Sequence, residues 1–150
     1  MAGAGGKVIW FYLPIEGRLV AVPRGVVRRV VKATRLAPDG NPYWGFSNAL
    51  SEREVMEFLR CLREGREPPP ELGRRVAYYI TFYAENLVLS TYMTVKALCG
   101  EEEAGDYLGS MEPVLEELRS MLYRAEREGA SRSLLWRMLQ LCIRHGMDPF

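Results

Sequence analysis

The stretch LGRRVAYYITFYAENLVLSTYMTVKALC, residues 72–99, decides the fold because it has the length of one long helix and carries apolar side chains on every face. Only four of its side chains are charged, and these are Arg74, Arg75, Glu85 and Lys96. A helix that is apolar all round must be covered all round. We therefore expect this segment to be surrounded by the chain's other helices, by a second subunit or by both.

A membrane-spanning helix is the first rival interpretation of this stretch. Glu85 and Asn86 lie near its centre, and its four tyrosines are spread along it. A bilayer-spanning segment instead concentrates tyrosine at its ends and excludes charge from its middle. We therefore predict no membrane association. Glu85 is expected to pair with an arginine of a neighbouring helix or subunit and to fix how the helices fit, and a functional carboxylate is the alternative.

The composition indicates one globular unit. A chain of 150 residues has the size of one domain, or of one small domain with an appendage. Its content of 48% hydrophobic and 26% charged residues is typical of a folded protein. Its three cysteines are far apart and odd in number, which argues against a disulfide framework and favours a cytoplasmic protein.

The front third of the chain is basic, with seven Lys or Arg residues and two acidic residues among residues 1–50. This excess is more often a solvated basic face, and the alternative is contact with an anionic partner, either an acidic protein or a phosphate backbone, including weak DNA binding. The candidate contacts are Arg18, Arg24, Arg28, Arg29 and Lys32.

The same region carries strand patterns. Residues 8–13 and 18–22 are rich in aromatic or β-branched side chains, and a proline follows each stretch, which predicts a hairpin of two strands. The spacing of four valines fits one face of a short helix over residues 24–32. Residues 34–36 are expected to add a third strand. The front is thus predicted to be a small β-rich domain, residues 1–46, in the order strand, strand, helix, strand.

From residue 47 onward the pattern is helical. Ser51 and Glu54 form a capping box before a helix with one apolar face. Pro113 is suited to the first turn of a further helix, preceded by a short acidic segment at residues 101–109. The predicted fold class is therefore α+β, in which the small N-terminal β domain is followed by a mainly α-helical bundle domain, residues 47–150.

The inventory of reactive side chains is thin. His145 is the only histidine, and it lies at the end of the last predicted helix, where a cation suits the helix dipole. The sequence has no zinc-ligand spacing, nucleophile elbow or phosphate-binding loop. We therefore predict that the protein is not an enzyme and has no catalytic residue, no cofactor and no metal site.

The long apolar segment is instead predicted to bind a partner subunit. Its aromatic and aliphatic side chains, together with Glu85, would supply the contact surface. The candidate partner-binding residues are Tyr78, Tyr79, Phe82, Tyr83, Glu85, Leu87 and Tyr92.

Several stretches resemble GINS proteins of the archaeal type that places a small β domain first. The order strand, proline, short helix and strand across residues 18–36 is similar to that domain. EPPPELGRRVAYYI, residues 67–80, resembles the proline-containing start of the family's long tyrosine-rich helix. ELRSMLYRA, residues 117–125, and SLLW, residues 133–136, resemble its late helices.

This resemblance implies a non-catalytic scaffold subunit of a GINS-like complex that links the MCM replicative helicase to a Cdc45/RecJ-like partner in DNA replication. In that family the helical domains of the subunits pack together. Another GINS-type subunit is therefore an implied partner, in a hetero-oligomer of the tetrameric kind.

Two alternatives come from other helical proteins. Residues 51–122, with RRVAY at 74–78 and PVLEELRSML at 113–122, are similar to the small stalk subunit of archaeal RNA polymerase, although the preceding 50 residues fit that family poorly. A small helical subunit of a CRISPR effector that contacts nucleic acid is the other alternative, and it predicts arginines along one helical face.

Overall fold

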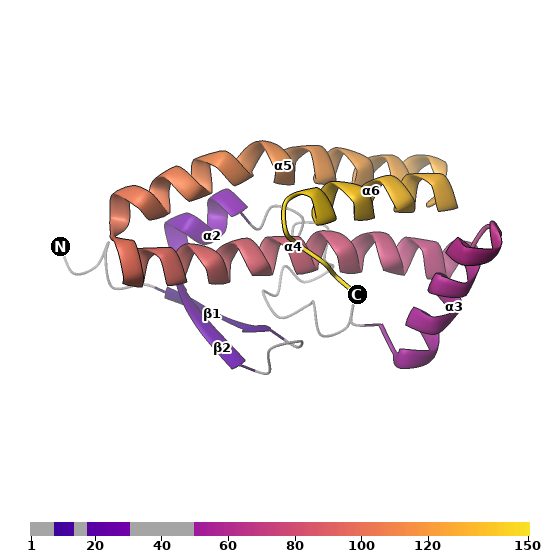
Figure 1. Ribbon diagram of the computed structural model, residues 1–150, viewed down its shortest axis with the longest axis horizontal. Helices are drawn as coiled ribbons and strands as arrows, with labels where there is room; N and C mark the ends of the chain where they lie inside the picture. Colours follow the sequence, from indigo (N-terminus) through magenta and orange to yellow (C-terminus); the bar gives the residue numbers. More distant parts are fainter. Residues whose placement is uncertain (1–7, 14–17, 31–49) are drawn as a thin grey trace.

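The computed structural model describes residues 8–13, 18–30 and 50–150. In this part of the chain a hairpin is followed by five helices: β1 (Val8–Leu13), β2 (Arg18–Pro23), α2 (Arg24–Val30), α3 (Glu52–Glu64), α4 (Pro70–Cys99), α5 (Glu101–Glu128) and α6 (Arg132–Arg144). The long helices α4 and α5 lie side by side along the long axis, and α6 packs on both (Figure 1). The described part of the chain is therefore a helical bundle.

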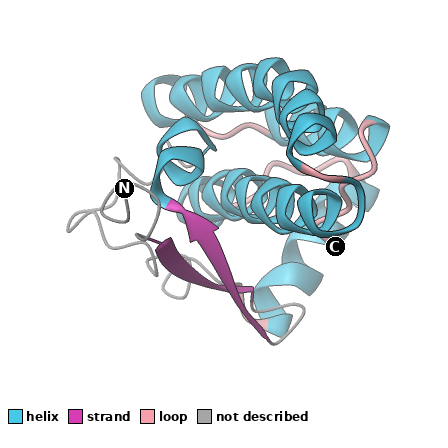
Figure 2. Ribbon diagram, turned by 90° about the vertical axis from the view of Figure 1, so that its left-hand side faces the viewer, coloured by secondary structure: helices cyan, strands magenta, loops and turns pink. Residues whose placement is uncertain are grey.

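The predicted α+β fold with an N-terminal β domain is wrong. β1 and β2 form a single antiparallel pair, with Val8 opposite Pro23 and Leu13 opposite Arg18. Figure 2 shows this hairpin on one side of the helices. Two strands are too few for independent stability, and α2 contacts α4 and α5 as well as the hairpin, so these elements are attached to the bundle. The third strand predicted at residues 34–36 and the domain boundary at residue 46 lie outside the described residues.

Local caps begin and end α3. The Ser51 hydroxyl accepts a hydrogen bond from the Glu54 backbone N–H at 3.2 Å, and the Glu54 carboxylate accepts one from the Ser51 N–H at 2.9 Å. Gly65 ends the helix at φ 71°, where its N–H donates to carbonyls of the last turn. The predicted capping box is therefore confirmed.

Helix α4 is the centre of the bundle, and the long helix predicted at residues 72–99 is confirmed. Its buried side chains run from Leu72 to Ser90 and include every residue from Ala84 to Asn86. Helices α3, α5 and α6, together with α2 and β2, contact it. The chain's own elements thus cover most of this apolar helix, whereas the nine residues from Thr91 to Cys99 include no buried side chain.

Helix α5 is longer than its sequence pattern suggested, because Pro113 lies inside it and does not open it. Seven of its buried residues recur at alternating spacings of four and three along the helix, and they are Ala104, Leu108, Met111, Leu115, Leu118, Leu122 and Ala125; Val114 is buried beside them. This continuous stripe packs on α4 and outweighs the lost proline N–H. The acidic segment at residues 101–109 is therefore the first part of one helix.

The end of the chain packs back onto the bundle after α6. The buried Met147 joins the hydrophobic core, and the Tyr79 hydroxyl donates a hydrogen bond to the Pro149 carbonyl at 2.8 Å. The Phe150 ring lies 5.4 Å from the Tyr79 ring and 5.6 Å from the Phe58 ring, between centroids. These contacts fasten residues 147–150 over α3 and α4. None of the described helices combines the length and the apolar character that crossing a bilayer requires.

The start of α4 approaches the turn between α5 and α6 closely. A Cβ atom placed on Gly73 would lie 2.7 Å from the Ala130 carbonyl oxygen and 3.2 Å from the Ala130 Cβ. Both neighbours belong to a packed turn, so neither moves away as a flexible side-chain end would. Gly105 of α5, in contrast, has no atom within 4 Å of an added Cβ.

We predict opposite effects for alanine at these two helical glycines. Gly73→Ala should lower the free energy of unfolding by about 1–3 kcal/mol, because overpacking outweighs the gain in helix propensity. Gly105→Ala should raise it by about 0.5–1 kcal/mol, because only the propensity changes. Urea denaturation followed by circular dichroism measures both, and equal effects at the two sites would contradict the close approach.

Candidate protein-interaction site

Helix α4 carries polar side chains in the core of the bundle. Thr81, Glu85, Asn86 and Ser90 are all at most 5% exposed, and Glu85 is fully buried. Thr81 and Asn86 each donate a hydrogen bond of 2.9 Å to the backbone carbonyl four residues earlier, Ala77 and Phe82. These local bonds use the Thr81 hydroxyl and the Asn86 amide N–H, while the buried Asn86 Oδ1 has no hydrogen-bond partner among the described residues. A buried carboxylate, in contrast, needs a cationic partner.

Arg119 of α5 supplies that partner. Its Nε lies 3.0 Å from the Glu85 Oε2, which forms an ion pair between α4 and α5. The same guanidinium donates to the Val30 carbonyl at the end of α2 and to the Glu116 carboxylate at 3.2 Å. A planar guanidinium with five N–H donors can serve all three acceptors. The predicted pairing of Glu85 with an arginine of a neighbouring helix is thus confirmed, within one chain.

A second arginine attaches α2 to α5 at the surface. Arg29 donates to both carboxylate oxygens of Glu112, at 2.5 and 3.3 Å. Arg29 was predicted to contact an anionic partner, and its guanidinium is already paired in this chain. Arg24 is exposed, while the side chains of Arg18, Arg28 and Lys32 lie outside the described part. An anionic partner of this basic region stays a prediction.

The predicted partner-binding residues of α4 do not share one exposed surface. Tyr78, Phe82 and Glu85 are buried in this chain, at 6%, 7% and 0% exposed. The other four are partly buried, and they are Tyr79, Tyr83, Leu87 and Tyr92. A role of these side chains in binding a partner stays a prediction, and the strongly exposed apolar side chains lie elsewhere.

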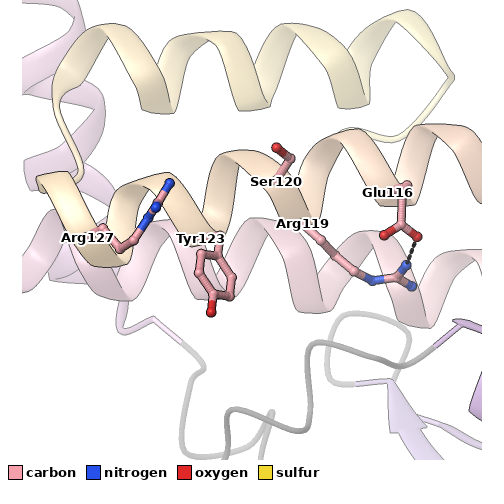
Figure 3. A pocket seen from close by; sticks show the side chains of 5 residues that line it. All are labelled: Glu116, Arg119, Ser120, Tyr123 and Arg127. Atoms are coloured by element: carbon pink, nitrogen blue, oxygen red, sulfur yellow. Dashed lines mark hydrogen bonds and ion pairs between the residues drawn. The ribbon is translucent and has the colours of Figure 1, made fainter.

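The outer face of α5 carries an exposed aromatic ring beside cationic groups. A hollow of about 480 Å³ is lined along this helix by residues at helical spacing, which are Glu116, Arg119, Ser120, Tyr123 and Arg127 (Figure 3). We call these five residues the α5 face. Tyr123 is 59% exposed, and the Arg127 guanidinium lies 5.4 Å from the centre of its ring, within the range of a cation–π interaction.

The sequence contained a signal for this face that the prediction missed. The apolar stripe of α5 includes Leu118, Leu122 and Ala125, and Tyr123 falls outside it on the polar side of the helix. A single exposed aromatic residue is common on protein surfaces, but one that lies beside a cationic side chain at helical spacing is a candidate contact residue. Trp136 and Ile143 of α6 are also exposed, at 45% and 52%.

The α5 face presents charged, polar and aromatic groups together. It offers cations, a phenol, a hydroxyl and one carboxylate along a single helix. In the part of the chain that the structure describes, no three His, Cys, Asp or Glu side chains are grouped as metal ligands. Comparison with protein-family models, curated proteins and solved structures finds no match to the chain.

We predict that Arg119→Met costs far more stability than Arg29→Met, although both arginines join α2 to α5. The first change leaves the fully buried Glu85 without its cation, and losing one partner of a buried pair costs about 3–5 kcal/mol. The second change removes an exposed pair worth about 1 kcal/mol or less. Urea denaturation at neutral pH measures both values, and a cost below about 1 kcal/mol for Arg119→Met would contradict the buried pair.

A second prediction concerns alkaline pH. Burial, with the nearby Tyr83 and Asp148, raises the pKa of Tyr79 from 10.0 to about 12, and its neutral hydroxyl donates to Pro149. The fold therefore favours the protonated phenol. This contribution to stability is fully present below pH 10 and is lost as the pH rises towards 12.

Tyr79→Phe should thus be less stable than the parent chain at pH 8, by about 1 kcal/mol for the lost hydrogen bond. The difference should be smaller at pH 11. Only the parent chain has a phenol at residue 79, and ionisation of this buried phenol at high pH favours unfolding. Tyr123→Phe, at an exposed ring, is the control and should change stability at neither pH. A stability difference for Tyr79→Phe that stays constant from pH 8 to pH 11 would contradict this assignment.

Proposed function

We propose that the chain is a non-catalytic scaffold subunit that binds a protein partner through the α5 face. The observation that carries the proposal is Tyr123, a large aromatic side chain that is 59% exposed and lies against the Arg127 guanidinium. Tyrosine and arginine are enriched among the residues that dominate binding energy at protein interfaces. A ring already held by its neighbour loses less conformational entropy when a partner covers it.

The charges around Tyr123 favour a protein over a nucleic acid. Glu116 and Arg119 lie on the same face, so acidic and basic groups alternate around the ring. Glu117, Glu126 and Glu128 add further carboxylates to this half of α5. A phosphate backbone requires a surface of one positive sign, whereas a protein partner can present both donors and acceptors.

Arg119 connects the α5 face to the interior. It lines the hollow beside Tyr123, and it also holds Glu85 of α4 and the Val30 carbonyl of α2. A partner that covers this face would therefore rest on the residue that joins three elements of the bundle. A surface attached to the interior in this way suits a scaffold.

The assembly we propose is a GINS-like replication complex, with another GINS-type subunit, the MCM helicase and a Cdc45/RecJ-like protein as partners. Its support is the resemblance of residues 67–80, 117–125 and 133–136, which fall on the start of α4, on α5 and on α6. The segment at 117–125 includes Arg119, Ser120 and Tyr123 of the α5 face. An N-terminal β domain forms no part of this support.

Affinity capture from a native lysate of the source cells tests the proposal. The tagged parent chain should recover MCM helicase or GINS-type subunits, identified by mass spectrometry. Tyr123→Ala should reduce this recovery at least about tenfold, since such hot-spot truncations cost about 2 kcal/mol or more. Met56→Ala, which removes a side chain 55% exposed on α3, is the matched control and should leave recovery unchanged.

Other results would overturn parts of the proposal. Recovery of RNA polymerase subunits or CRISPR effector proteins would replace the GINS-like assembly by one of the alternatives. Equal recovery by Tyr123→Ala and the parent chain, with unchanged circular dichroism, would show that the partner binds away from the α5 face.

A further inference from the structure

The outer side of α6 is a second exposed surface, distinct from the α5 face. We call Trp136, Arg137, Gln140, Ile143 and Arg144 the α6 face. Four of them, all but Arg137, line a hollow of about 420 Å³. Trp136 and Ile143 are 45% and 52% exposed, and both line this same hollow, so they form an apolar pair on a polar helix face.

The α6 face is strongly basic. The helix contains three arginines and no carboxylate. Arg137 and Arg144 are exposed, and neither forms an ion pair with any residue that the structure describes. The face therefore combines two apolar side chains with two cations that lack a counter-charge in the described ranges.

The turn between α4 and α5 has the opposite character. Leu98, 79% exposed at the end of α4, directly precedes Cys99, which together with Glu102, Glu103 and Asp106 lines a hollow of about 430 Å³. We call these five residues the acidic turn. Its three carboxylates form no ion pair within the described part of the chain, and the sequence contains no Lys or Arg between Lys96 and Arg119.

We propose that the α6 face binds the acidic turn of a second copy of this chain. Leu98 of one copy would enter the hollow beside Trp136 and Ile143 of the other. The carboxylates of Glu102, Glu103 and Asp106 would pair with Arg137 and Arg144. This contact is separate from the α5 face and goes beyond the proposed function.

The arrangement of the helices requires two copies for this contact. The acidic turn lies at one end of the long axis, where α4 meets α5, whereas α6 covers the opposite half of the bundle (Figure 1). One molecule therefore cannot bring its own two surfaces together. Because the surfaces differ, each contact leaves one of each kind unused, so the copies associate head to tail in an open chain or a closed ring.

A second copy explains these surfaces better than a nucleic acid does. A nucleic acid would use the arginines and could stack on Trp136, but Ile143 and the exposed Leu98 would have no role. The acidic turn complements both features of the α6 face. Its carboxylates can pair with the arginines, and its apolar side chain Leu98 can enter the hollow beside Trp136 and Ile143. Complementary charge also determines the orientation of approach.

Charge reversal tests the contact directly. At low salt, light scattering should give a mass for the parent chain that rises with protein concentration, and added salt should lower it. Arg137→Glu/Arg144→Glu and Glu102→Lys/Glu103→Lys should each be monomeric, because both surfaces of each variant then carry the same sign. An equimolar mixture of the two variants should associate again, since opposite signs meet.

A matched control separates this contact from general charge effects. Arg60 and Arg63 are exposed on α3. The variant Arg60→Glu/Arg63→Glu changes the net charge of the protein by the same amount and should associate as the parent chain does. Tyr123→Ala should also keep self-association. Loss of partner binding at the α5 face and loss of self-association at the α6 face are therefore measured with different variants.

Cross-linking provides an independent readout. Cys99 is exposed in the acidic turn, while Cys61 and Cys142 are buried. Gln140→Cys should therefore give disulfide-linked multimers after mild copper–phenanthroline oxidation. The additional change Cys99→Ser should abolish them.

Three results would overturn the proposal. The first is a parent chain that stays monomeric at every concentration at low salt. The second is association that the charge-reversed variants retain when alone. The third is a monomeric parent chain that binds a fluorescent single-stranded oligonucleotide at low salt and loses this binding with Arg137→Glu/Arg144→Glu, which would assign the α6 face to nucleic acid.

Discussion

The bundle depends on one guanidinium. Arg119 of α5 pairs with the fully buried Glu85 of α4 at 3.0 Å and donates to the last carbonyl of α2, Val30. A carboxylate enclosed in apolar surroundings is costly unless a cation compensates it, so the position of α5 on α4 is restricted to the one that brings these groups together. The same guanidinium holds the C-terminal end of α2. The hairpin precedes α2 and contacts it, so it is attached through this helix. One side chain thus links the core to its attachments.

The sequence predicted the parts of the fold that local rules and burial determine. The long helix and the capping box at Ser51 follow from spacing and hydrogen-bond chemistry, and the need of Glu85 for an arginine follows from electrostatics. The β domain was wrong because strand propensity indicates strands but not whether they form a domain. The prediction that Pro113 opens a helix was wrong, because the apolar stripe from Ala104 to Ala125 stabilises one continuous helix that includes the proline.

The candidate site was harder to predict than the core. The most apolar helix was expected to bind the partner, yet its own chain covers it as far as Ser90. Beyond Ser90, Leu98 is exposed at the end of the same helix, and further exposed apolar groups are single residues on otherwise polar helices, such as Tyr123 on α5 and Trp136 and Ile143 on α6. Their positions off the buried stripes were visible in the sequence. The sequence could not show which charged groups lie beside these exposed side chains. Some arginines, such as Arg29, form ion pairs within the chain, and only the structure shows which ones do.

A double-mutant cycle on the central pair tests this account most directly. Unfolding free energies of the parent chain, Glu85→Gln, Arg119→Met and the double variant give the coupling between the two side chains. We predict a coupling of about 2 kcal/mol or more, with Arg119→Met costing much less once Glu85 is already replaced by glutamine. Costs that add to within about 0.5 kcal/mol would contradict the claim that this ion pair determines how the helices fit.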